Sequence, residues 1–179
     1  MSFTKKLQSL FSWTHTKSLL IEGHHLEQKN KTSHFSRLPF CSMGDIYYAK
    51  IGVNIGWEID KTRPVIIFQG KDRFLKNSGT IFIFPITSKI KMFDYRISFD
   101  QHDIHNNEKD INIHPSQILL TQGRCISRIR LGQKIGTLSE CKLREIQSQF
   151  NLFLYKNTPL HPMDKGATQT ALIKKPAIT

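Results

Sequence analysis

Two polar side chains, Arg63 and Thr87, stand beside apolar runs that have the composition of β-strands. Arg63 precedes Pro64 and the apolar residues 65–68, and Thr87 directly follows the apolar run 81–86. A guanidinium keeps its charge and can donate two hydrogen bonds to a phosphate. A threonine hydroxyl can hold a phosphate oxygen or an attacking hydroxyl. Because strands hold reactive groups more rigidly than loops, this placement predicts a site that acts on a phosphate.

Both side chains also have an ordinary structural interpretation. Arg63 could form an ion pair with Glu58 or Asp60 at the rim of a sheet, and Thr87 could simply be a β-branched residue that ends a strand. A carboxylate beside an arginine is normally ionised and paired. Glu58 could therefore orient Arg63 or act as a base, and the spacing alone leaves these alternatives open.

Composition and charge limit the class of protein without locating a site. The chain has 179 residues and a net charge of +12, with the basic excess spread along its whole length. This charge suits a polyanionic partner but also serves solubility. No apolar run approaches the roughly 18 residues that span a bilayer, and the N-terminus lacks the pattern of a signal peptide. We therefore expect a cytoplasmic protein that does not contact a membrane.

Cysteine and histidine spacing gives no support for a metal centre. The three cysteines are widely separated, which favours reduced, partly buried thiols. His24-His25 and the pair His102 and His105 lack cysteine or carboxylate partners at ligand spacing. We expect neither a metal nor another cofactor. His102 or His105 could still act as a base near neutral pH, although solvated loop histidines are the simpler interpretation.

The order of predicted elements indicates a small β-rich domain. Strands are predicted at 46–51, 64–68, 81–86, 93–99 and 116–121 from their β-branched and aromatic content. Residues 124–129 extend the sheet or begin a turn. A helix is predicted to follow the N-cap Ser139, with an apolar stripe that ends at Leu154. Many short strands with one late helix predict a small, strongly bent antiparallel barrel.

The ends of the chain differ from this central part, and three regions are predicted. Residues 1–40 form an N-terminal helical extension of one or two short helices, interrupted at Gly23 and packed on the outside of the barrel. Residues 41–156 form the barrel domain. Residues 157–179 contain few large apolar side chains and are predicted to be a flexible tail.

Several short motifs occur in a fixed order through the central region. They are Gly44-Asp45-Ile46, Gly56-Trp57-Glu58, Arg63-Pro64-Val65, Pro85-Ile86-Thr87-Ser88, Gln122-Gly123-Arg124 and the signature at 130–139. Each motif alone is weak, but their order and spacing are specific. Residues 43–155 thereby resemble the MazF/PemK toxin family of bacterial type II toxin–antitoxin modules.

The resemblance implies a fold and an activity. The fold is mainly β with a C-terminal helix, an SH3-like or CcdB-type antiparallel barrel that forms a homodimer. The activity is sequence-selective, metal-independent cleavage of single-stranded RNA by 2′-OH attack, which leaves a 2′,3′-cyclic phosphate and a 5′-OH. An acidic antitoxin is the implied protein partner, and the bacterial cytoplasm the implied location.

The resemblance also assigns roles to residues. Arg63 becomes the stabiliser of the phosphate and proton donor to the leaving oxygen, Thr87 positions the attack, and Glu58 occupies the loop carboxylate position. Arg124 faces phosphate or ties the sheet together. We expect RNA contacts from five residues, of which the loop tryptophan could read an unpaired base by stacking or could cap the core. These residues are Asn54, Trp57, Ser88, Lys89 and Arg124.

One departure and two alternatives qualify this prediction. Some family members carry an acidic residue directly before the glutamine of the Q-x-R motif, where this chain has Thr121. This change favours a mechanism that depends on the arginine and threonine. The alternatives are a non-catalytic, gyrase-directed inhibitor of the CcdB type and a nucleic-acid-binding module. The second would apply if Arg63 and Thr87 pointed away from a common cleft.

Overall fold

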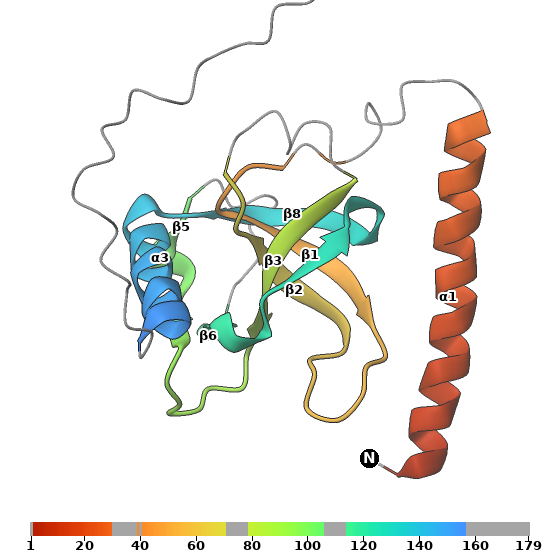
Figure 1. Ribbon diagram of the computed structural model, residues 1–179, viewed down its shortest axis with the longest axis horizontal. Helices are drawn as coiled ribbons and strands as arrows, with labels where there is room; N and C mark the ends of the chain where they lie inside the picture. Colours follow the sequence, from red (N-terminus) through yellow and green to blue (C-terminus); the bar gives the residue numbers. More distant parts are fainter. Residues whose placement is uncertain (1, 30–38, 40, 71–78, 106–113, 157–179) are drawn as a thin grey trace, which may run out of the picture.

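The computed structural model describes residues 2–29, 39, 41–70, 79–105 and 114–156. The chain begins with helix α1, continues through eight strands with three short 3-10 helices, and reaches helix α3 (Figure 1). The elements are α1 (Phe3–Lys29), β1 (Asp45–Gly52), β2 (Lys61–Ile67), β3 (Thr80–Thr87), β4 (Arg96–Phe99), η1 (Gln101–Asp103), β5 (Ile104–His105), β6 (Ser116–Leu119), η3 (Leu120–Gln122), β7 (Arg124–Ser127), η4 (Arg128–Arg130), β8 (Leu131–Leu138) and α3 (Glu140–Tyr155).

The strands form one antiparallel sheet in the order β4-β6-β3-β2-β1-β8-β5, and β7 pairs with β3 beside this path. Strands β1, β2 and β3 follow one another in sequence and lie side by side. The prediction of a mainly antiparallel β-fold with a helix at each end is confirmed. The closed SH3-like or CcdB-type barrel stays a prediction.

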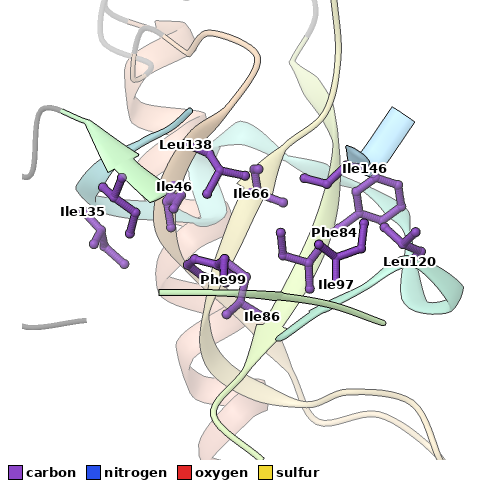
Figure 2. Packing of buried hydrophobic residues seen from close by; sticks show 12 residues of the cluster. Ile46, Ile66, Phe84, Ile86, Ile97, Phe99, Leu120, Ile135, Leu138 and Ile146 are labelled. Carbon is purple, nitrogen blue, oxygen red and sulfur yellow. The ribbon is translucent and has the colours of Figure 1, made fainter. Parts of the chain in front are cut away.

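One hydrophobic cluster fills the space between the sheet and α3. Phe84, Ile66 and Ile146 are fully buried within it, and Figure 2 shows these side chains from the strands and the helix converging. The Phe84 ring lies 4.9 Å from that of Phe150 and 5.1 Å from that of Phe68, measured between ring centroids. Aromatic pairs in this range stabilise a core beyond their buried area.

A second cluster covers the opposite face of the same strands. It includes Val65 and Ile67 from β2 and Ile81 and Ile83 from β3, all with no exposed surface. Cys41 belongs to this cluster, and burial raises the pKa of its thiol although the neighbouring Arg128 acts in the opposite direction. Strands β2 and β3 are therefore buried on both faces, and the alternation of a half-buried strand is absent from their centres.

The C-terminal helix begins where the sequence predicts. The Ser139 hydroxyl accepts a hydrogen bond from the Lys142 amide at 3.3 Å, which satisfies one free N–H of the first turn. Ile146 is buried, and Leu143 and Phe150 pack beside it against the first cluster. The prediction of the N-cap is confirmed. The apolar stripe is confirmed as far as Phe150, whereas Phe153 and Leu154 are 37% and 47% exposed.

The N-terminal segment was predicted as one or two short helices, and residues 3–29 form one long continuous helix. The predicted interruption at Gly23 is absent, because a glycine weakens a helix by about 1 kcal/mol relative to alanine without removing its backbone N–H. Large apolar side chains of this helix remain exposed. Phe3 and Phe11 are 79% and 73% exposed, and the side toward the sheet is largely polar. No helix among the described residues is long and apolar enough to cross a membrane.

Most predicted strands are present, with shifted bounds. The strand predicted at 93–99 is limited to β4, since Phe93 is 63% exposed and Tyr95 has a positive φ of 61°. Strands β5 and β8 had no counterpart in the sequence prediction. The tail predicted at 157–179 lies outside the described residues.

The position of Phe84 between α3 and the sheet predicts a large loss of stability on truncation. We expect Phe84→Ala to lower the free energy of unfolding by about 3–5 kcal/mol, because it removes a buried ring and leaves a cavity. Urea denaturation followed by tryptophan fluorescence would measure the change. The exposed Phe93, substituted in the same way, should cost less than about 1 kcal/mol, and equal losses in the two variants would contradict the burial seen here.

Candidate active site

Arg63 and Thr87 lie at the same end of neighbouring antiparallel strands. Val65 pairs with Pro85 and Ile67 pairs with Ile83. Continuing this register by two residues brings Arg63 opposite Thr87, although the ladder itself ends at Val65. Because side chains two apart share a face, both residues extend the face that carries the second cluster. This register places the two residues at one end of the sheet.

The contacts of Arg63 match the structural alternative considered for it. Its Nε donates to the backbone carbonyl of Asp60 at 2.9 Å, and its terminal nitrogen lies 3.9 Å from the Asp60 carboxylate. The Arg63 side chain remains 29% exposed. A long, half-exposed ion pair of this kind contributes little stability, so one edge of the guanidinium is held while the group remains accessible to solvent.

Three side chains hold the loop between β1 and β2 at Ile59. The amide of Asn54 donates to the Ile59 carbonyl at 2.6 Å, and a terminal nitrogen of Arg124 donates to the same oxygen at 3.2 Å. The Gln122 side-chain oxygen accepts from the Ile59 amide at 3.2 Å. Of the two roles considered for Arg124, tying the structure together is therefore observed. Asn54 likewise holds the loop.

The two arginines come together through this loop. Arg63 donates to the carbonyl of Asp60, and Arg124 donates to that of the preceding residue, Ile59. Two guanidinium groups from strands that are distant in sequence thus flank two consecutive peptide groups. Gly123, between Gln122 and Arg124, packs against the core, because a Cβ there would lie 2.7 Å from the Phe84 ring. Each residue of the Q-x-R motif therefore has a structural role: Gln122 and Arg124 bind the loop backbone, and Gly123 packs against Phe84.

The tip of the same loop projects into solvent. Trp57 is 99% exposed, so the suggestion that it caps the core is wrong. Glu58 is also exposed and takes part in none of the ion pairs found among the described residues. Its position on a tethered loop gives the carboxylate access to solvent close in sequence to Arg63. An exposed tryptophan here is available to a ligand.

Thr87 shapes the loop that follows β3. Its hydroxyl accepts from the Lys89 amide at 3.2 Å, which forms a tight turn through Ser88. Thr87 itself is buried, whereas Ser88 and Lys89 are exposed. The buried Gln117 then holds the loop by accepting from the Lys91 amide at 3.0 Å. Both sides of the candidate site are therefore fixed by side-chain contacts to the backbone.

The histidine and metal alternatives concern other parts of the fold. His105 lies on β5, at the edge of the sheet, and β1 and β8 separate this strand from β2. His102 lies in η1 directly before β5. No group of three or more histidine, cysteine or acidic side chains in the described part of the chain could hold a metal ion. The thiols of Cys125 and Cys141 are free and exposed, so the expectation of partial burial holds for Cys41 alone.

Comparison with known families gives this site a context. Residues 42–154 match the family of PemK-like, MazF-like toxins of type II toxin–antitoxin systems. The chain belongs to this family. The match includes every strand and nearly all of α3 but begins after α1. The resemblance predicted from the motifs is therefore confirmed.

Individual members of the family agree with this assignment. The chain is 30% identical to the endoribonuclease MazF of Staphylococcus saprophyticus over 116 residues, which cover 64% of this chain and 92% of that protein. A crystal structure of MazF from Deinococcus radiodurans is similar in fold, with a TM-score of 0.54 at 15% identity over 65% of this chain and 97% of that one. A mycobacterial endoribonuclease gives a TM-score of 0.51 at 9% identity over 66% and 95% of the two chains.

Sequence reasoning missed Gln122 as a residue of the site. Within the motif Gln122-Gly123-Arg124, a role was predicted only for Arg124. Gln122 also donates to the Trp57 carbonyl at 3.5 Å, so it contacts the backbone on both sides of Glu58. A glutamine followed by glycine and arginine after a predicted strand could have indicated a contact with loop backbone, because its side-chain amide both donates and accepts.

The contacts of Gln122 predict a local role. Gln122→Ala removes both of its bonds to the loop, and we expect amide exchange at Ile59 to become at least several-fold faster through easier local opening. Exchange in β2 and β3 should change little. Hydrogen exchange with mass spectrometry would measure this, with the exposed Gln133→Ala as the matched control. Unchanged protection of the loop would show that Gln122 does not hold it.

Proposed function

We propose that this chain is an endoribonuclease toxin that cleaves single-stranded RNA at the site formed by the β1–β2 loop, the start of β2 and the end of β3. Membership of the PemK-like, MazF-like family supports the toxin class, and the relative from Staphylococcus saprophyticus is an endoribonuclease. The observation that carries the proposal is the position of Arg63. It lies opposite Thr87 when the β2–β3 register is extended by two residues, and it binds the carbonyl next to the one that Arg124 binds.

The proposed reaction is an internal transesterification. The 2′-oxygen of the ribose attacks the adjacent phosphorus, a bond from phosphorus to that oxygen forms, and the bond to the 5′-oxygen breaks. The products are a 2′,3′-cyclic phosphate and a 5′-OH. A base must take the proton of the 2′-OH, and the departing 5′-oxygen must gain one. Negative charge rises on the phosphorus oxygens in the transition state, which is where positive groups accelerate the reaction.

Arginine side chains provide that positive charge without a metal in this scheme. Arg63 would donate to the phosphate oxygens and assist the 5′-oxygen as it leaves. Its bond to the Asp60 carbonyl fixes its planar group, so little side-chain freedom is lost in the transition state. Arg124, bound to the neighbouring carbonyl, adds a second positive charge to the same region.

The remaining predicted residues would position the RNA. Thr87 would orient the attacking ribose from its fixed place at the end of β3, and Glu58 would accept the 2′-OH proton. The exposed Trp57 could stack on an unpaired base. Asn54 would act by holding the β1–β2 loop. Ser88 and Lys89 are exposed directly after β3 and would contact the sugar–phosphate backbone of the RNA next to the cleaved position.

The proposal extends to the organisation of the chain and to its partners. Residues 41–156 would form the catalytic domain, residues 1–40 an extension and residues 157–179 a tail. A homodimer in the bacterial cytoplasm would be silenced by an acidic antitoxin laid across the basic groove. The family description, a toxin of a toxin–antitoxin system, supports the antitoxin, and the net charge of +12 suits an acidic partner.

Arg63→Ala should reduce the rate of cleavage by roughly 10²–10³-fold, because it removes the donor that faces the developing charge. Arg63→Lys should recover only part of the rate, since an ammonium lacks the planar fork. Purified protein would be incubated with a long single-stranded RNA in EDTA, with cut sites mapped by primer extension. Thr87→Val should also slow cleavage, while Thr87→Ser retains the hydroxyl.

The matched control is Arg144→Ala, because the Arg144 side chain is 81% exposed on α3 and pairs only with Glu140 among the described residues. Wild-type rates from Arg63→Ala would exclude its catalytic role. Intact RNA at high protein concentration would instead favour the gyrase-directed alternative. The exposed Leu152, Leu154 and Tyr155 at the end of α3 offer that activity a binding surface, which a DNA supercoiling assay would test.

A further inference from the structure

A basic pocket lies between α1 and the hairpin of β1 and β2, outside the site described above. Its volume is about 730 Å³, and its lining includes Lys5 from the helix, Lys50 from β1 and Lys61 from β2. No carboxylate is among the described residues that line it. Lysines from three separate elements therefore converge on one cavity, and a concave surface lined by one sign of charge strengthens the local field.

Hydrogen-bond donors accompany the lysines. Gln8 and Ser12 on α1 and Thr62 on β2 line the same pocket and add an amide and two hydroxyls. The donors surround a space large enough for a nucleotide. Ammonium and hydroxyl groups without a negative partner suit a phosphate, whose oxygens accept several hydrogen bonds at once.

A specific contact holds α1 at this distance from the sheet. The Trp13 ring packs against Gly52, where a Cβ would lie 2.5 Å from the ring. Gly52 also has a φ of +104°, a conformation that favours glycine. On the other side, the Arg130 guanidinium lies 5.5 Å from the centre of the Trp13 ring. Figure 1 shows α1 beside the strands.

The backbone at Lys61 is strained. Lys61 has a φ of +71°, which few residues other than glycine adopt, and it pairs with Gly52 across an irregularity in the ladder. Such outliers cost on the order of 1–3 kcal/mol and concentrate at functional sites. A bulge redirects a side chain relative to a regular strand. Here the irregularity accompanies a lysine, Lys61, that lines the pocket, so the strained conformation coincides with a possible ligand contact.

The pocket lies next to Arg63 along the hairpin but on its other face. Ala49 pairs with Arg63, and the next pair along the ladder is Lys50 with Thr62. Because successive side chains alternate between faces, Lys50 and Thr62 project away from the side that carries Arg63. An RNA strand that reached both places would pass the exposed loop that carries Trp57. The pocket would then hold nucleotides that flank the cut and take no part in the chemistry.

We propose that this pocket binds the phosphate backbone of single-stranded RNA beside the cleaved position, and that α1 thereby extends the substrate groove. The inference rests on the proposed ribonuclease function. An acidic peptide is the competing ligand, but peptides that dock in grooves rely on apolar anchors. The helix side that lines this pocket instead presents mainly polar side chains, including Lys5, Gln8 and Ser12, and Trp13 is its one aromatic side chain.

The test compares RNA binding by two proteins that differ in the pocket. Both carry Arg63→Ala, so that the RNA stays intact, and one also carries Lys5→Ala, Lys50→Ala and Lys61→Ala. Binding of a fluorescent single-stranded RNA is followed by anisotropy over a range of salt concentrations. Each lost phosphate contact on a single strand lowers the slope of log K against log salt by about 0.7, so we expect a slope smaller by about 2 and at least tenfold weaker binding.

Two further variants separate the pocket from general effects. Lys17→Ala removes one exposed charge from the same helix outside the pocket and should change binding little. Trp13→Ala releases α1 from Gly52 and should weaken binding, with a smaller change of slope than the triple substitution, because only the contribution of the helix is lost. In proteins that retain Arg63, the triple substitution should raise KM for RNA cleavage about tenfold and leave kcat unchanged. This is expected because the pocket would bind the RNA equally well in the ground state and in the transition state.

The possible outcomes are distinct. If the wild-type chain cuts RNA but the triple variant binds with unchanged affinity and slope, the pocket inference is wrong and the ribonuclease function stands. If the wild-type chain binds RNA through the lysines without cutting it, the pocket inference holds and the ribonuclease function fails. RNA affinity that is unchanged, with loss of binding to a polyglutamate peptide, would assign the pocket to an acidic protein and overturn the inference.

Discussion

Burial of the central strands on both faces constrains the rest of the structure. Val65, Ile66 and Ile67 in β2, like Ile83 and Phe84 in β3, have no exposed surface. A charged side chain in this region would lose its hydration without a partner, which costs several kcal/mol. Polar groups therefore occur where the strands end. The position of the candidate site at the start of β2 and the end of β3 follows directly from the way the core is filled.

The same constraint explains why the site depends so much on backbone contacts. The β1–β2 loop packs Ile59 against the second cluster. The same residue is held by hydrogen bonds between its backbone and the side chains of Asn54, Gln122 and Arg124. The β3–β4 loop is held by Thr87 and Gln117. Side chains that bind loop backbone fix the geometry of the loop while its own side chains stay free for a ligand.

The sequence predicted the strands with apolar centres and the capped helix, because those features depend on local composition. It did not predict β8, since Leu131, Ile135 and Leu138 are spaced by four and three residues, as in a helix. The pairing of β8 with β1 shifts register twice, which explains that spacing. The sequence also did not determine which carboxylate pairs with Arg63, because this too depends on the backbone geometry. Whether it pairs with Glu58 or Asp60 depends on the turn geometry, including the left-handed Lys61, which spacing does not encode.

Helix α1 was predicted from the spacing of its apolar residues, but most of these residues do not face the sheet. Phe3, Leu10 and Phe11 remain exposed, while a polar side with one tryptophan lies against the hairpin. A helix held only for stability would turn its apolar face inward, since burial of each large side chain contributes about 1.5–3 kcal/mol. This helix leaves that energy unused and keeps a lysine-lined space between itself and the sheet. Phosphate binding in that space, as proposed above, would account for this arrangement, which burial of apolar surface does not.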